Sequence, residues 1–420
     1  MVAPASRCIG DGMHILFVTD NFPPETNAPA SRTFEHARQW VREGHRVTVI
    51  TCVPNFPKGR VFEGYRNRPW QCEQIEGVDV VRVWSFISAN EGFALRVLDF
   101  MSFMASAMIA GLFVRRPDIV VATSPQFFTL IAGNWIRFWR RVPWVLELRD
   151  IWPESIKAVG AMRQSVVIRL LERIEMGLYR RADRIVIVAR SFAGILAARG
   201  IDPGKIDVVT NGVDLSRFAP MASDALRARL GWSDRFVVGY IGTHGMAHAL
   251  ETLLGAANLL QADPQAHDVT IAFIGDGARK AALEADARNR GLSNVMFLPS
   301  VSKTEVVEHW GALDATVVHL RGTDLFRSVI PSKIFEAMAM GVPILMGVEG
   351  EACDIVLNAR AGIAFEPESA QGLADAIRAL RGDPALRHDM SASAVVAAPR
   401  FDRRNLAREF LEIMKGVVRG

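Results

Sequence analysis

The sequence predicts an α/β protein that consists of two doubly wound domains. Short apolar runs typical of buried strands alternate with amphipathic stretches typical of helices along the whole chain. This alternation restarts after Gly200, and 420 residues are too many for one ordinary hydrophobic core. Continuous apolar strands separated by helices indicate parallel sheets that are covered on both faces. Residues 1–205 and 206–399 are therefore each expected to form a Rossmann-like domain, followed by a final helix within 400–420.

The elements of the first domain follow from the spacing of its apolar residues. Phe34, Ala37 and Val41 recur at helical spacing, and Gly44 can end the helix predicted at 31–43. Further helices are expected at 93–114, 127–138 and about 163–181, and strands at 14–18, 46–51, 78–84, 118–122, 144–148 and 184–188.

The second domain repeats this pattern. Strands are expected at 207–210, 236–241, 270–274, 295–297, 315–319 and 343–346, with helices between them. A linker is expected between residues 201 and 234, and a last helix at about 405–417 after the break at Pro399. Ligands of such sheets bind outside the carboxyl ends of the strands, so the loops that follow the strands are the candidate site.

Charge is divided unevenly between the two domains. Residues 1–205 carry 27 Lys and Arg against 19 Asp and Glu, a net charge of +8, whereas residues 206–420 carry 22 against 26, a net charge of −4. A basic domain can face an anionic membrane or an acidic acceptor, or its arginines can simply solvate the surface. The chain has no basic run with interleaved aromatic residues, which argues against nucleic acid as a partner.

The longest apolar run covers residues 100–114 and is followed by Arg115 and Arg116. Its 15 residues are fewer than the roughly 20 that a membrane-spanning helix needs. Two interpretations remain open: a buried helix of the α/β domain, or a helix that lies in the membrane interface with its arginines at the headgroups. Both hold if one face of the helix is buried and the other is exposed.

Neither the N-terminus nor the cysteines indicate secretion. Residues 1–12 lack the apolar stretch of a signal peptide, so a loose leader or a translation start at Met13 is expected. The four cysteines show neither a C-x-x-C pair nor metal-ligand spacing, which predicts free thiols in a reducing cytosol. They are Cys8, Cys52, Cys72 and Cys353.

The most informative stretch covers residues 330–343. Pro331 stands at an expected first helical turn, where a missing N–H group is tolerated. Ser332, Lys333 and Glu336 then share one helix face near that N-terminus. The free N–H groups and the helix dipole attract an anion such as a diphosphate. A glutamate one turn into the helix can accept hydrogen bonds from two vicinal hydroxyls, such as those of a ribose.

This stretch resembles the donor-nucleotide motif of retaining GT-B glycosyltransferases of family 4. The family pattern has two glutamates, E-x7-E, and the second holds the ribose of a nucleotide-sugar. Glu336 takes the second place, whereas Ser328 stands where the first glutamate would be. The resemblance implies the GT-B fold, in which two Rossmann-like domains face each other across a cleft. It also implies that the helix within 400–420 packs back on the first domain.

A loop of the first domain extends the resemblance. Phe22-Pro23-Pro24-Glu25 follows the first expected strand and resembles the acceptor-side F-P-P-E loop of the family. Asn27 lies where the family commonly has a Gly-Gly pair, and Arg32 follows it. The resemblance makes Glu25 a catalytic candidate, with a solvated loop residue as the plain alternative. Long loops in compact domains are usually functional or disordered.

A second loop follows the expected strand 144–148. Arg149 precedes the run D-I-W-P-E-S, which begins at Asp150 and resembles the D-x-W-P-E-S signature of bacterial family 4 enzymes of lipopolysaccharide and capsule assembly. Asp150 is the second catalytic candidate, because a carboxylate there could bind acceptor hydroxyls or assist deprotonation of the acceptor. Alternatively, it pairs with Arg149 or caps the next helix. Arg149, Asn27 and Arg32 are the acceptor-side candidates. Many relatives have a histidine after the preceding strand, where this chain has none in residues 123–126.

Two loops of the second domain contain glycines that would let the backbone approach a phosphate. The first is 242–248 and the second, 275–280, resembles the G-D-G element of the family. Many relatives place Arg and Lys in the first loop, where this chain has Thr243, His244 and His248. The charge must therefore come from elsewhere, and the candidates are Arg321, Arg327 and Lys333. The expected donor-binding residues are Gly242, Thr243, His244, Gly245, Asp276, Gly277, Arg279, Arg327, Ser328, Ser332, Lys333 and Glu336. Neither a complete G-x-G-x-x-G motif at these turns nor a P-loop is present, which argues against NAD and ATP chemistry.

The resemblance thus implies a retaining glycosyltransferase that takes a sugar from a nucleotide-sugar. The expected donor is a UDP-linked N-acetylated deoxyhexose or hexose, since the chain resembles O-antigen and capsule enzymes, some of which transfer N-acetylfucosamine. The expected acceptor is a lipid-linked saccharide, with no metal cofactor and a cytoplasmic position on the inner face of the membrane. Two other hypotheses stay open: a GT-B-fold UDP-sugar 2-epimerase and an inert nucleotide-sugar-binding protein.

Overall fold

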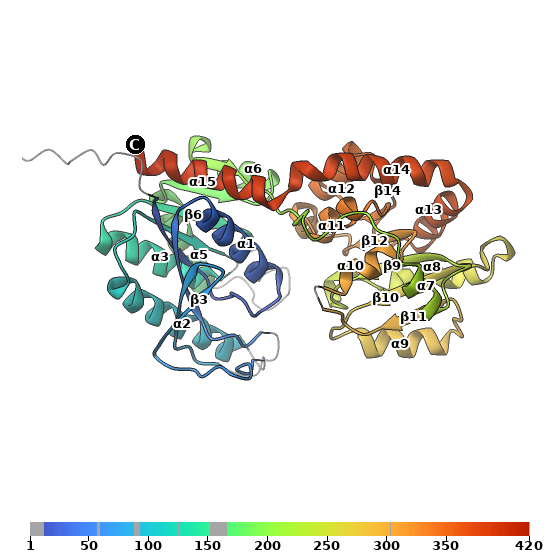
Figure 1. Ribbon diagram of the computed structural model, residues 1–420, viewed down its shortest axis with the longest axis horizontal. Coiled ribbons are helices and arrows are strands. Elements are labelled where there is room, and N and C mark those ends of the chain that lie inside the picture. Colours follow the sequence, from blue (N-terminus) through green and yellow to red (C-terminus); the bar gives the residue numbers. More distant parts are fainter. Residues whose placement is uncertain are drawn as a thin grey trace, which may run out of the picture. The chain divides into compact units, whose positions relative to one another are not determined.

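The computed structural model describes residues 12–56, 59–87, 93–124, 126–151, 166–302 and 304–419 (Figure 1). The chain forms two compact units, which confirms the expectation of two α/β domains on mainly parallel sheets. The first domain comprises Met1–Thr210 and Arg404–Gly420, and the second comprises Asn211–Arg403. The domain boundaries expected at 205/206 and 399/400 therefore move a few residues towards the C-terminus.

The first domain has an eight-stranded sheet in the order β3-β4-β2-β1-β5-β6-β7-β8. Its strands are parallel except β3, an edge strand that pairs antiparallel with β4. The sequence pattern missed β3 because it has few apolar residues and no fully buried one. The strands are β1 (His14–Val18), β2 (Arg46–Cys52), β3 (Trp70–Ile75), β4 (Val78–Val83), β5 (Ile119–Thr123), β6 (Trp144–Leu148), β7 (Arg184–Ile187) and β8 (Ile206–Val208).

Strand β8 corrects one sequence-based assignment. The run at 207–210 was expected to begin the second sheet, but β8 pairs in parallel with β7, with Ile185 opposite Ile206. Apolar periodicity predicts a strand without showing which sheet the strand joins. The first domain consequently extends to Thr210.

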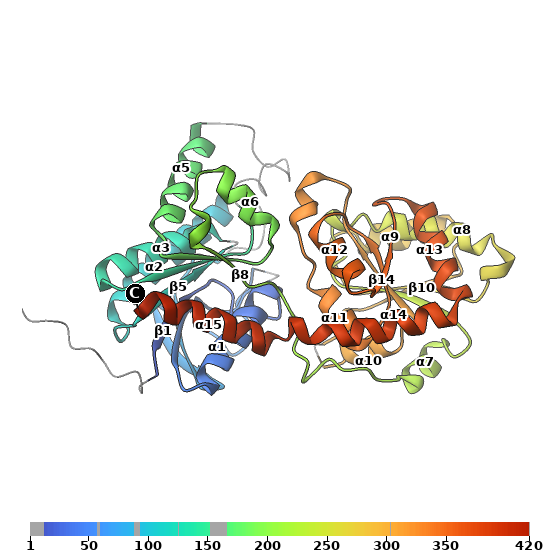
Figure 2. The ribbon, with the colours of Figure 1, turned by 90° about the horizontal axis from the view of Figure 1, so that it is seen from above.

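The final helix packs on the first domain, as expected from the resemblance. Trp40 of α1 donates a hydrogen bond from Nε1 to the carbonyl oxygen of Ala407 in α15 at 2.8 Å. The Trp40 and Phe410 rings meet edge to face with centroids 5.5 Å apart, and both side chains are buried. Figure 2 shows α15 beside α1 along the sheet. The bounds are α1 (Ala28–Arg42) and α15 (Arg403–Arg419).

Helices α2 and α3 pack against each other, and α3 also contacts the sheet. A Cβ atom at Gly111 of α2 would lie 2.4 Å from Ile136 of α3, and one at Gly133 of α3 would lie 2.5 Å from Ala122 of β5. These glycines are therefore needed for close packing. The helical segments are α2 (Phe93–Phe113), α3 (Phe127–Arg140), α5 (Val166–Arg181), α6 (Ser191–Ala198) and the 3₁₀ turn η1 (Pro203–Lys205).

The second domain has a six-stranded parallel sheet in the order β11-β10-β9-β12-β13-β14. The strand order reverses between β9 and β12, as in dinucleotide-binding folds. The three-residue β14 was too short for the sequence pattern to reveal. The strands are β9 (Phe236–Ile241), β10 (Val269–Ile274), β11 (Val295–Leu298), β12 (Ala315–His319), β13 (Ile344–Gly347) and β14 (Gly362–Ala364).

One core of the second domain lies between its sheet and helices α8, α9 and α13. Buried residues of these helices, among them Leu254 and Ile377, form one cluster with Ile271 and Val317 of the strands. The helices are α7 (Asp224–Leu230), α8 (Glu251–Gln261), α9 (Lys280–Asn289), α10 (Val306–Gly311), α11 (Lys333–Met340), α12 (Glu351–Asn358), α13 (Ala370–Gly382) and α14 (Pro384–Ala397). The 3₁₀ turns are η2 (Met246–His248), η3 (Pro264–Ala266), η4 (Asp324–Ser328) and η5 (Ala398–Phe401).

The two ends of the second domain are hydrogen-bonded to each other. Val213 donates from its amide to the carbonyl oxygen of Phe401 at 2.9 Å, and the amide of Arg403 donates to the carbonyl oxygen of Val213 at 3.0 Å. The Arg403 side chain also donates from Nε to the carbonyl oxygen of Gly212 at 2.7 Å. The segments through which the chain enters and leaves this domain are thus paired.

Replacing Phe410 with alanine should destabilise the first domain by about 3–5 kcal/mol, because the ring is fully buried against Trp40. Urea denaturation followed by tryptophan fluorescence measures this loss. Val418→Ala is the matched control on the same helix, since Val418 is 40% exposed and its truncation should change stability by about 0.5 kcal/mol or less. Equal stability losses in the two variants would contradict the packing of α15 described above.

Candidate functional site

The second domain contains a site at the point where its strand order reverses. In open α/β sheets, ligands bind outside the carboxyl ends of the strands at this reversal. The loops after β9 and β12 begin there, and α11 follows the second of them. The expected donor-binding residues lie in these two loops, in the loop after β10 and in the first turn of α11.

Three glycines bring the loops after β9 and β10 into contact. Gly242, Gly275 and Gly277 have φ values of +140°, +148° and +155°. A Cβ atom at Gly275 would lie 2.0 Å from the carbonyl oxygen of Gly242, which no other residue type tolerates. The His244 amide donates to the carbonyl oxygen of Asp276 at 2.8 Å, and the Arg279 amide donates to that of His244 at 2.9 Å. Thus the predicted glycine loops form one unit.

His244 and His248 lie in this unit as neutral side chains. His244 is fully buried, and neither of its ring nitrogens has a hydrogen-bond partner. Burial lowers the pKa of His244 to about 4, with a smaller effect from Lys280 and Lys333. Burial also lowers the pKa of His248 to about 4, and Lys333 adds to this shift. At neutral pH the two histidines therefore cannot replace the basic residues of many relatives.

Lys333 begins α11 and lies against the loop after β9. Its Nζ is 3.8 Å from the centre of the Tyr240 ring, and a Cβ atom at Gly242 would lie 2.8 Å from that nitrogen. Burial lowers the pKa of Lys333 to about 7, whereas the Glu336 carboxylate favours the charged amine. The structure thus brings together Lys333 and Gly242, two residues predicted from separate motifs.

The other cations expected at this site already have partners. Arg327 donates from Nε to Glu349 at 2.8 Å, and Arg321 donates from Nε to the carbonyl oxygen of Met246 at 2.7 Å. Arg279 is paired with Glu251. The diphosphate role predicted for Arg327 stays a prediction, and it would require exchange of an exposed ion pair.

The predicted polar face of α11 is confirmed. Its inner residues, among them Ile334 and Ala337, are completely buried, whereas Ser332 and Glu336 are half-buried. Ser332 occupies the N-cap position without forming a side-chain cap, so it leaves the N-terminal amides uncapped by a side chain. Ser328 ends η4 in the preceding loop.

In the first domain, Asn27 and Glu25 have structural contacts. The Asn27 side chain caps α1, accepting from the amide of Ala30 at 2.9 Å. Glu25 is buried, and its Oε1 accepts hydrogen bonds from the amides of Asn55 and Phe56 at 2.8 and 2.9 Å. Burial raises the pKa of Glu25 although both amides favour its ionised form. These bonds hold two loops together, and the catalytic role expected for Glu25 stays a prediction.

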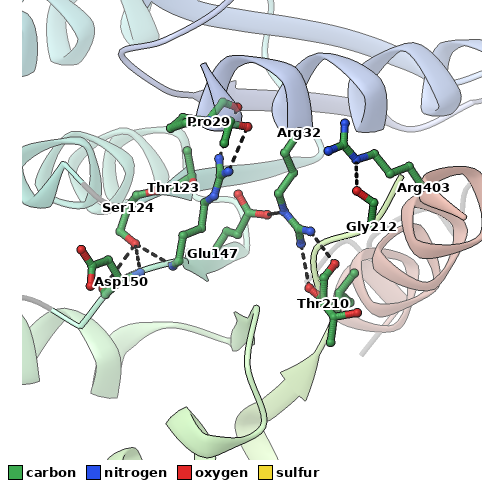
Figure 3. A network of polar contacts seen from close by, with 12 residues as sticks. Pro29, Arg32, Thr123, Ser124, Glu147, Asp150, Thr210, Gly212 and Arg403 are labelled. Carbon is green, nitrogen blue, oxygen red and sulfur yellow. Dashed lines mark hydrogen bonds and ion pairs between the residues drawn. The ribbon is translucent and has the colours of Figure 1, made fainter. Parts of the chain in front are cut away.

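Arg32, an expected acceptor-side residue, also has structural contacts. Its side chain is buried and donates to Glu147 Oε1 at 2.8 Å and to the carbonyl oxygens of Val209 and Thr210 at 2.8 and 2.6 Å (Figure 3). Burial opposes ionisation of Glu147, but Arg32 and, more weakly, Arg149 hold its pKa below the usual value. Arg32 therefore fixes the end of the first-domain chain, and the acceptor-side role expected for it stays a prediction.

Arg149 and Asp150 lie at the carboxyl end of β6, as predicted. Their amides donate to Ser124 Oγ at 2.7 and 3.2 Å, so a residue of the histidine-lacking loop fixes the turn (Figure 3). The Arg149 guanidinium donates to the carbonyl oxygens of Ala28 and Pro29, both at 3.2 Å. The rest of the predicted motif, residues 152–155, lies outside the described residues, as do Pro125 and residues 1–11.

Three residues with site-like properties were not singled out from the sequence. Glu147 is the one charged residue of an apolar strand, and Tyr240 is the one tyrosine of another. Each interrupts a run of apolar residues, so the sequence could have singled out both as candidates. Asp99 of α2 gave no such signal. Burial, and then the nearby Asp20, raise its pKa to about 7. Among the residues that the structure describes, no group of three or more His, Cys, Asp or Glu is placed to hold a metal ion.

Comparison with known families identifies the class of protein. The first domain matches the Glycosyl transferase 4-like domain over residues 27–212, and the second matches Glycosyl transferases group 1 over residues 223–395. Together these matches cover most of the chain, which therefore belongs to the glycosyltransferases that combine these two domains. The family assignment agrees with the loops and with the Glu336 helix described above.

Named relatives from two bacteria support the same class. The chain is 26% identical to the putative colanic acid biosynthesis glycosyl transferase WcaI of Escherichia coli, covering 96% of this chain and all of that protein. It is also 26% identical to the probable glycosyltransferase WbjE of Pseudomonas aeruginosa over 60% of this chain and 62% of that one.

Solved structures show that the fold is GT-B. HepE of Anabaena, solved with UDP, matches with a TM-score of 0.71 at 20% identity, covering 96% of this chain and all of that one. WaaG, a glycosyltransferase involved in lipopolysaccharide biosynthesis, matches with a TM-score of 0.67 at 16% identity, with the same coverage. The predicted fold class and the predicted family are therefore both confirmed.

Replacing Arg32 with methionine should destabilise the first domain by about 3–5 kcal/mol at pH 7, because it leaves the buried Glu147 carboxylate unpaired. Without its partner, Glu147 should have a raised pKa in the folded state. Stability is gained as pH falls through a raised folded-state pKa, so the deficit should shrink on acidification towards pH 5.

Urea denaturation of wild type and variant between pH 5 and 8 measures this dependence. The control is Arg290→Met, which breaks the half-exposed pair of Arg290 with Asp286 and should cost about 1 kcal/mol or less. A deficit that stays constant with pH would show that the variant loses packing rather than the charge pair.

Proposed function

We propose that this protein is a retaining glycosyltransferase that moves a sugar from a UDP-sugar to a lipid-linked saccharide during synthesis of a cell-surface polysaccharide. The observation that carries the donor half is the meeting of two glycine loops with Lys333 and the α11 N-terminus at the strand reversal of the second domain. The proposed sugar is an N-acetylated deoxyhexose or hexose.

The donor proposal is supported by the arrangement of groups on α11. The helix dipole favours an anion at the N-terminus, where no side chain caps the helix, and Lys333 begins the helix there. Glu336 follows one turn later, in the position from which a carboxylate can accept hydrogen bonds from a ribose. HepE, which shares the fold, was solved with UDP and with UDP-glucose, which supports UDP as the nucleotide.

The proposed reaction needs no metal ion. As the sugar leaves, negative charge develops on the diphosphate, and preorganised donors directed at that charge stabilise the transition state. The α11 amides supply partial positive charge, and a protonated Lys333 supplies a full one. Retention of the anomeric configuration is proposed from the family resemblance, with Asp150 as the residue assigned to the acceptor hydroxyl.

The acceptor proposal is supported by relatives and by an apolar surface. WcaI is described as a colanic acid biosynthesis enzyme, which indicates a cell-surface saccharide. In the described part of the chain, one helical stretch, Leu95–Phe113 of α2, is by length and composition apolar enough to cross a membrane. Phe103, Ala107 and Ala110 are buried, so part of α2 packs within the domain.

The other side of α2 and part of α3 are exposed. The large exposed side chains of α2 are Leu95, Leu98, Met101, Ile109, Leu112 and Phe113. Those of α3 are Trp135, Phe138 and Trp139. Arg115 and Arg116 follow α2 directly and are exposed. Aromatic side chains next to arginines are typical of surfaces that lie in a membrane interface. We therefore propose that this surface, the α2–α3 face, holds the enzyme on the inner face of the cytoplasmic membrane.

One assay distinguishes the proposed reaction from the two other hypotheses. The purified protein is incubated with radiolabelled UDP-sugars and a bacterial lipid extract, and products are separated into lipid and aqueous phases. Transfer of label to lipid supports the proposal, and NMR of the anomeric proton in the product tests retention. Appearance of an epimeric UDP-sugar would identify an epimerase, and binding without turnover would identify an inert sugar-nucleotide-binding protein.

Replacing Glu336 with alanine should weaken UDP binding by about 1.5–3 kcal/mol, or about 10- to 150-fold, because a charge-assisted hydrogen bond to the ribose is lost. Titration calorimetry with UDP measures the effect. Glu284→Ala on α9 is the control, since it removes a half-buried glutamate outside the loops of the site. If the folded Glu336→Ala protein bound UDP with wild-type affinity, the proposal that Glu336 binds the ribose would be wrong.

The double variant Phe138→Ser with Trp139→Ser should bind anionic vesicles about tenfold or more weakly than wild type, because two aromatic anchors are lost. Arg115→Glu with Arg116→Glu should also weaken binding, by about 1 kcal/mol for each lost cation, and mainly at low salt. Co-sedimentation with vesicles measures both effects. Val396→Ser, which removes an 80% exposed side chain of α14, should leave binding unchanged. If the wild-type protein does not bind anionic vesicles at low salt, the proposed membrane-binding role of the α2–α3 face is wrong and α2 serves only to pack the domain.

A further inference from the structure

Lys333 has no ion-pair partner among the described residues, although the Glu336 carboxylate favours its charged form. Its Nζ lies over the Tyr240 ring at 3.8 Å, and no carboxylate of the described residues lies within ion-pair distance of it. Around the Tyr240 ring lie His244 and His248, with ring centres 5.9 and 6.0 Å away. Three of their four ring nitrogens are buried without hydrogen-bond partners. The loop after β9 therefore contains buried imidazole nitrogens that form no hydrogen bond, close to the Lys333 amine.

We propose that Tyr240 positions Lys333 as a vacant anion-binding amine, and that binding of a nucleoside diphosphate at this site takes up a proton onto Lys333. This inference rests on the proposed donor role of the site and adds how the site acquires its charge. Tyr240 is a positioning residue here, because it acts on the ligand through the amine.

The reason for proton uptake is the balance between burial and charge. Burial lowers the pKa of Lys333 to about 7, so much of the amine is neutral above that pH in the absence of ligand. A diphosphate beside the amine favours its charged form and raises the pKa again. Binding at pH 8 should therefore transfer close to one proton from the solvent to Lys333.

Neighbouring groups do not supply this charge in place of Lys333. The histidines are neutral, with pKa values of about 4. Lys280 donates to the carbonyl oxygens of Gly275 and Leu298, both at 2.9 Å. The titratable groups that act on Lys333 or lie beside it are Tyr240 of β9, His244 and His248 of the next loop, and Glu336 of α11. The histidines in turn interact with Asp276 and Lys280 after β10 and with His319 at the end of β12, and His319 interacts with Arg321.

His319 and Arg321 are likewise occupied. Nδ1 of His319 lies 2.7 Å from the carbonyl oxygen of His248, and its Nε2 accepts from the amide of Glu368 at 2.9 Å. This bonding fixes a neutral imidazole, whose pKa is lowered chiefly by burial. Arg321 is held by Met246 and Glu368. Of these groups, Lys333 is thus the one whose protonation changes near neutral pH, and it lies beside Gly242.

Tyr240 is suited to hold the amine in both protonation states. Its hydroxyl donates to the carbonyl oxygen of Thr243 at 2.9 Å, which fixes the ring within the loop. The ring face attracts an ammonium without neutralising it, unlike a carboxylate, so the charge stays available to a ligand. A Cβ atom at Gly242 would collide with Nζ, so glycine is also needed for this placement.

The experiment is titration calorimetry of UDP into the full chain at pH 8 in buffers with different ionisation enthalpies. At this pH the terminal phosphate of UDP is itself largely ionised, because such groups titrate near pH 6. Wild type should take up close to one proton, and its UDP affinity should fall about tenfold for each pH unit above 7. Lys333→Arg should bind without proton uptake and without that pH dependence, because arginine keeps its charge.

The Tyr240 variants test the positioning role. Tyr240→Phe keeps the ring and should keep both the proton uptake and the pH profile. Tyr240→Leu keeps the site apolar but removes the ring face, so UDP affinity at pH 7 should fall by about 2- to 30-fold. The pH at which affinity begins to fall should also move downwards. A Tyr240→Leu profile with the wild-type midpoint would remove the positioning role, and Lys415→Arg in the first domain serves as an unaffected control.

Inorganic pyrophosphate as a second probe separates this inference from the proposed donor. If pyrophosphate binds with Lys333-dependent proton uptake but UDP does not bind, the anion site stands and the UDP-sugar proposal fails. If UDP binds without proton uptake, or with the same uptake in Lys333→Arg, the inference is overturned and the donor proposal stands. If neither probe binds, both are overturned.

Discussion

The close approach of two glycine loops is the constraint on which the second-domain site depends. Because Gly275 has no side chain, its backbone reaches the carbonyl oxygen of Gly242, and the loops after β9 and β10 form one surface. That surface borders the strand reversal between β9 and β12. It leaves room beside Gly242 for the Lys333 amine, which lies over Tyr240. A side chain at Gly275 would displace the Gly242 backbone, and a side chain at Gly242 would displace the Lys333 amine.

The number of basic residues near this site overstates how many of them are available to bind an anion. Arg279, Arg321 and Arg327 belong to the loops of the site, but each already forms an ion pair or a hydrogen bond within the protein. Lys333 lacks an anionic partner because the group beneath it is an aromatic ring rather than a carboxylate. The cost of keeping such an amine charged in a poorly hydrated place is what lowers its pKa. An anion that enters the site removes this cost.

The residues singled out in the first domain make structural contacts. Asn27 caps α1, Glu25 ties two loops together, and Arg32 joins Glu147 to the end of the domain at Thr210. These contacts stabilise the loops at the carboxyl edge of the sheet. Asp150 is the member of the predicted catalytic pair that lies at the end of a strand, with its backbone held by Ser124. The catalytic roles expected for Glu25 and Asp150 both stay predictions.

The sequence alone determined the two mainly parallel sheets and the polar face of α11, because apolar periodicity and glycine-rich turns are local patterns. The GT-B family followed from the resemblance of its loop and helix motifs. It predicted the runs at β1, β6, β9 and β12 with their observed bounds. It missed the polar edge strand β3 and placed β8 in the wrong sheet, since hydrogen-bonding partners are not encoded in periodicity. Only the tertiary structure decided that Arg32 is buried and that Lys333 has an aromatic partner. Burial and pairing depend on residues that are distant in the chain, and no local spacing shows which of them meet.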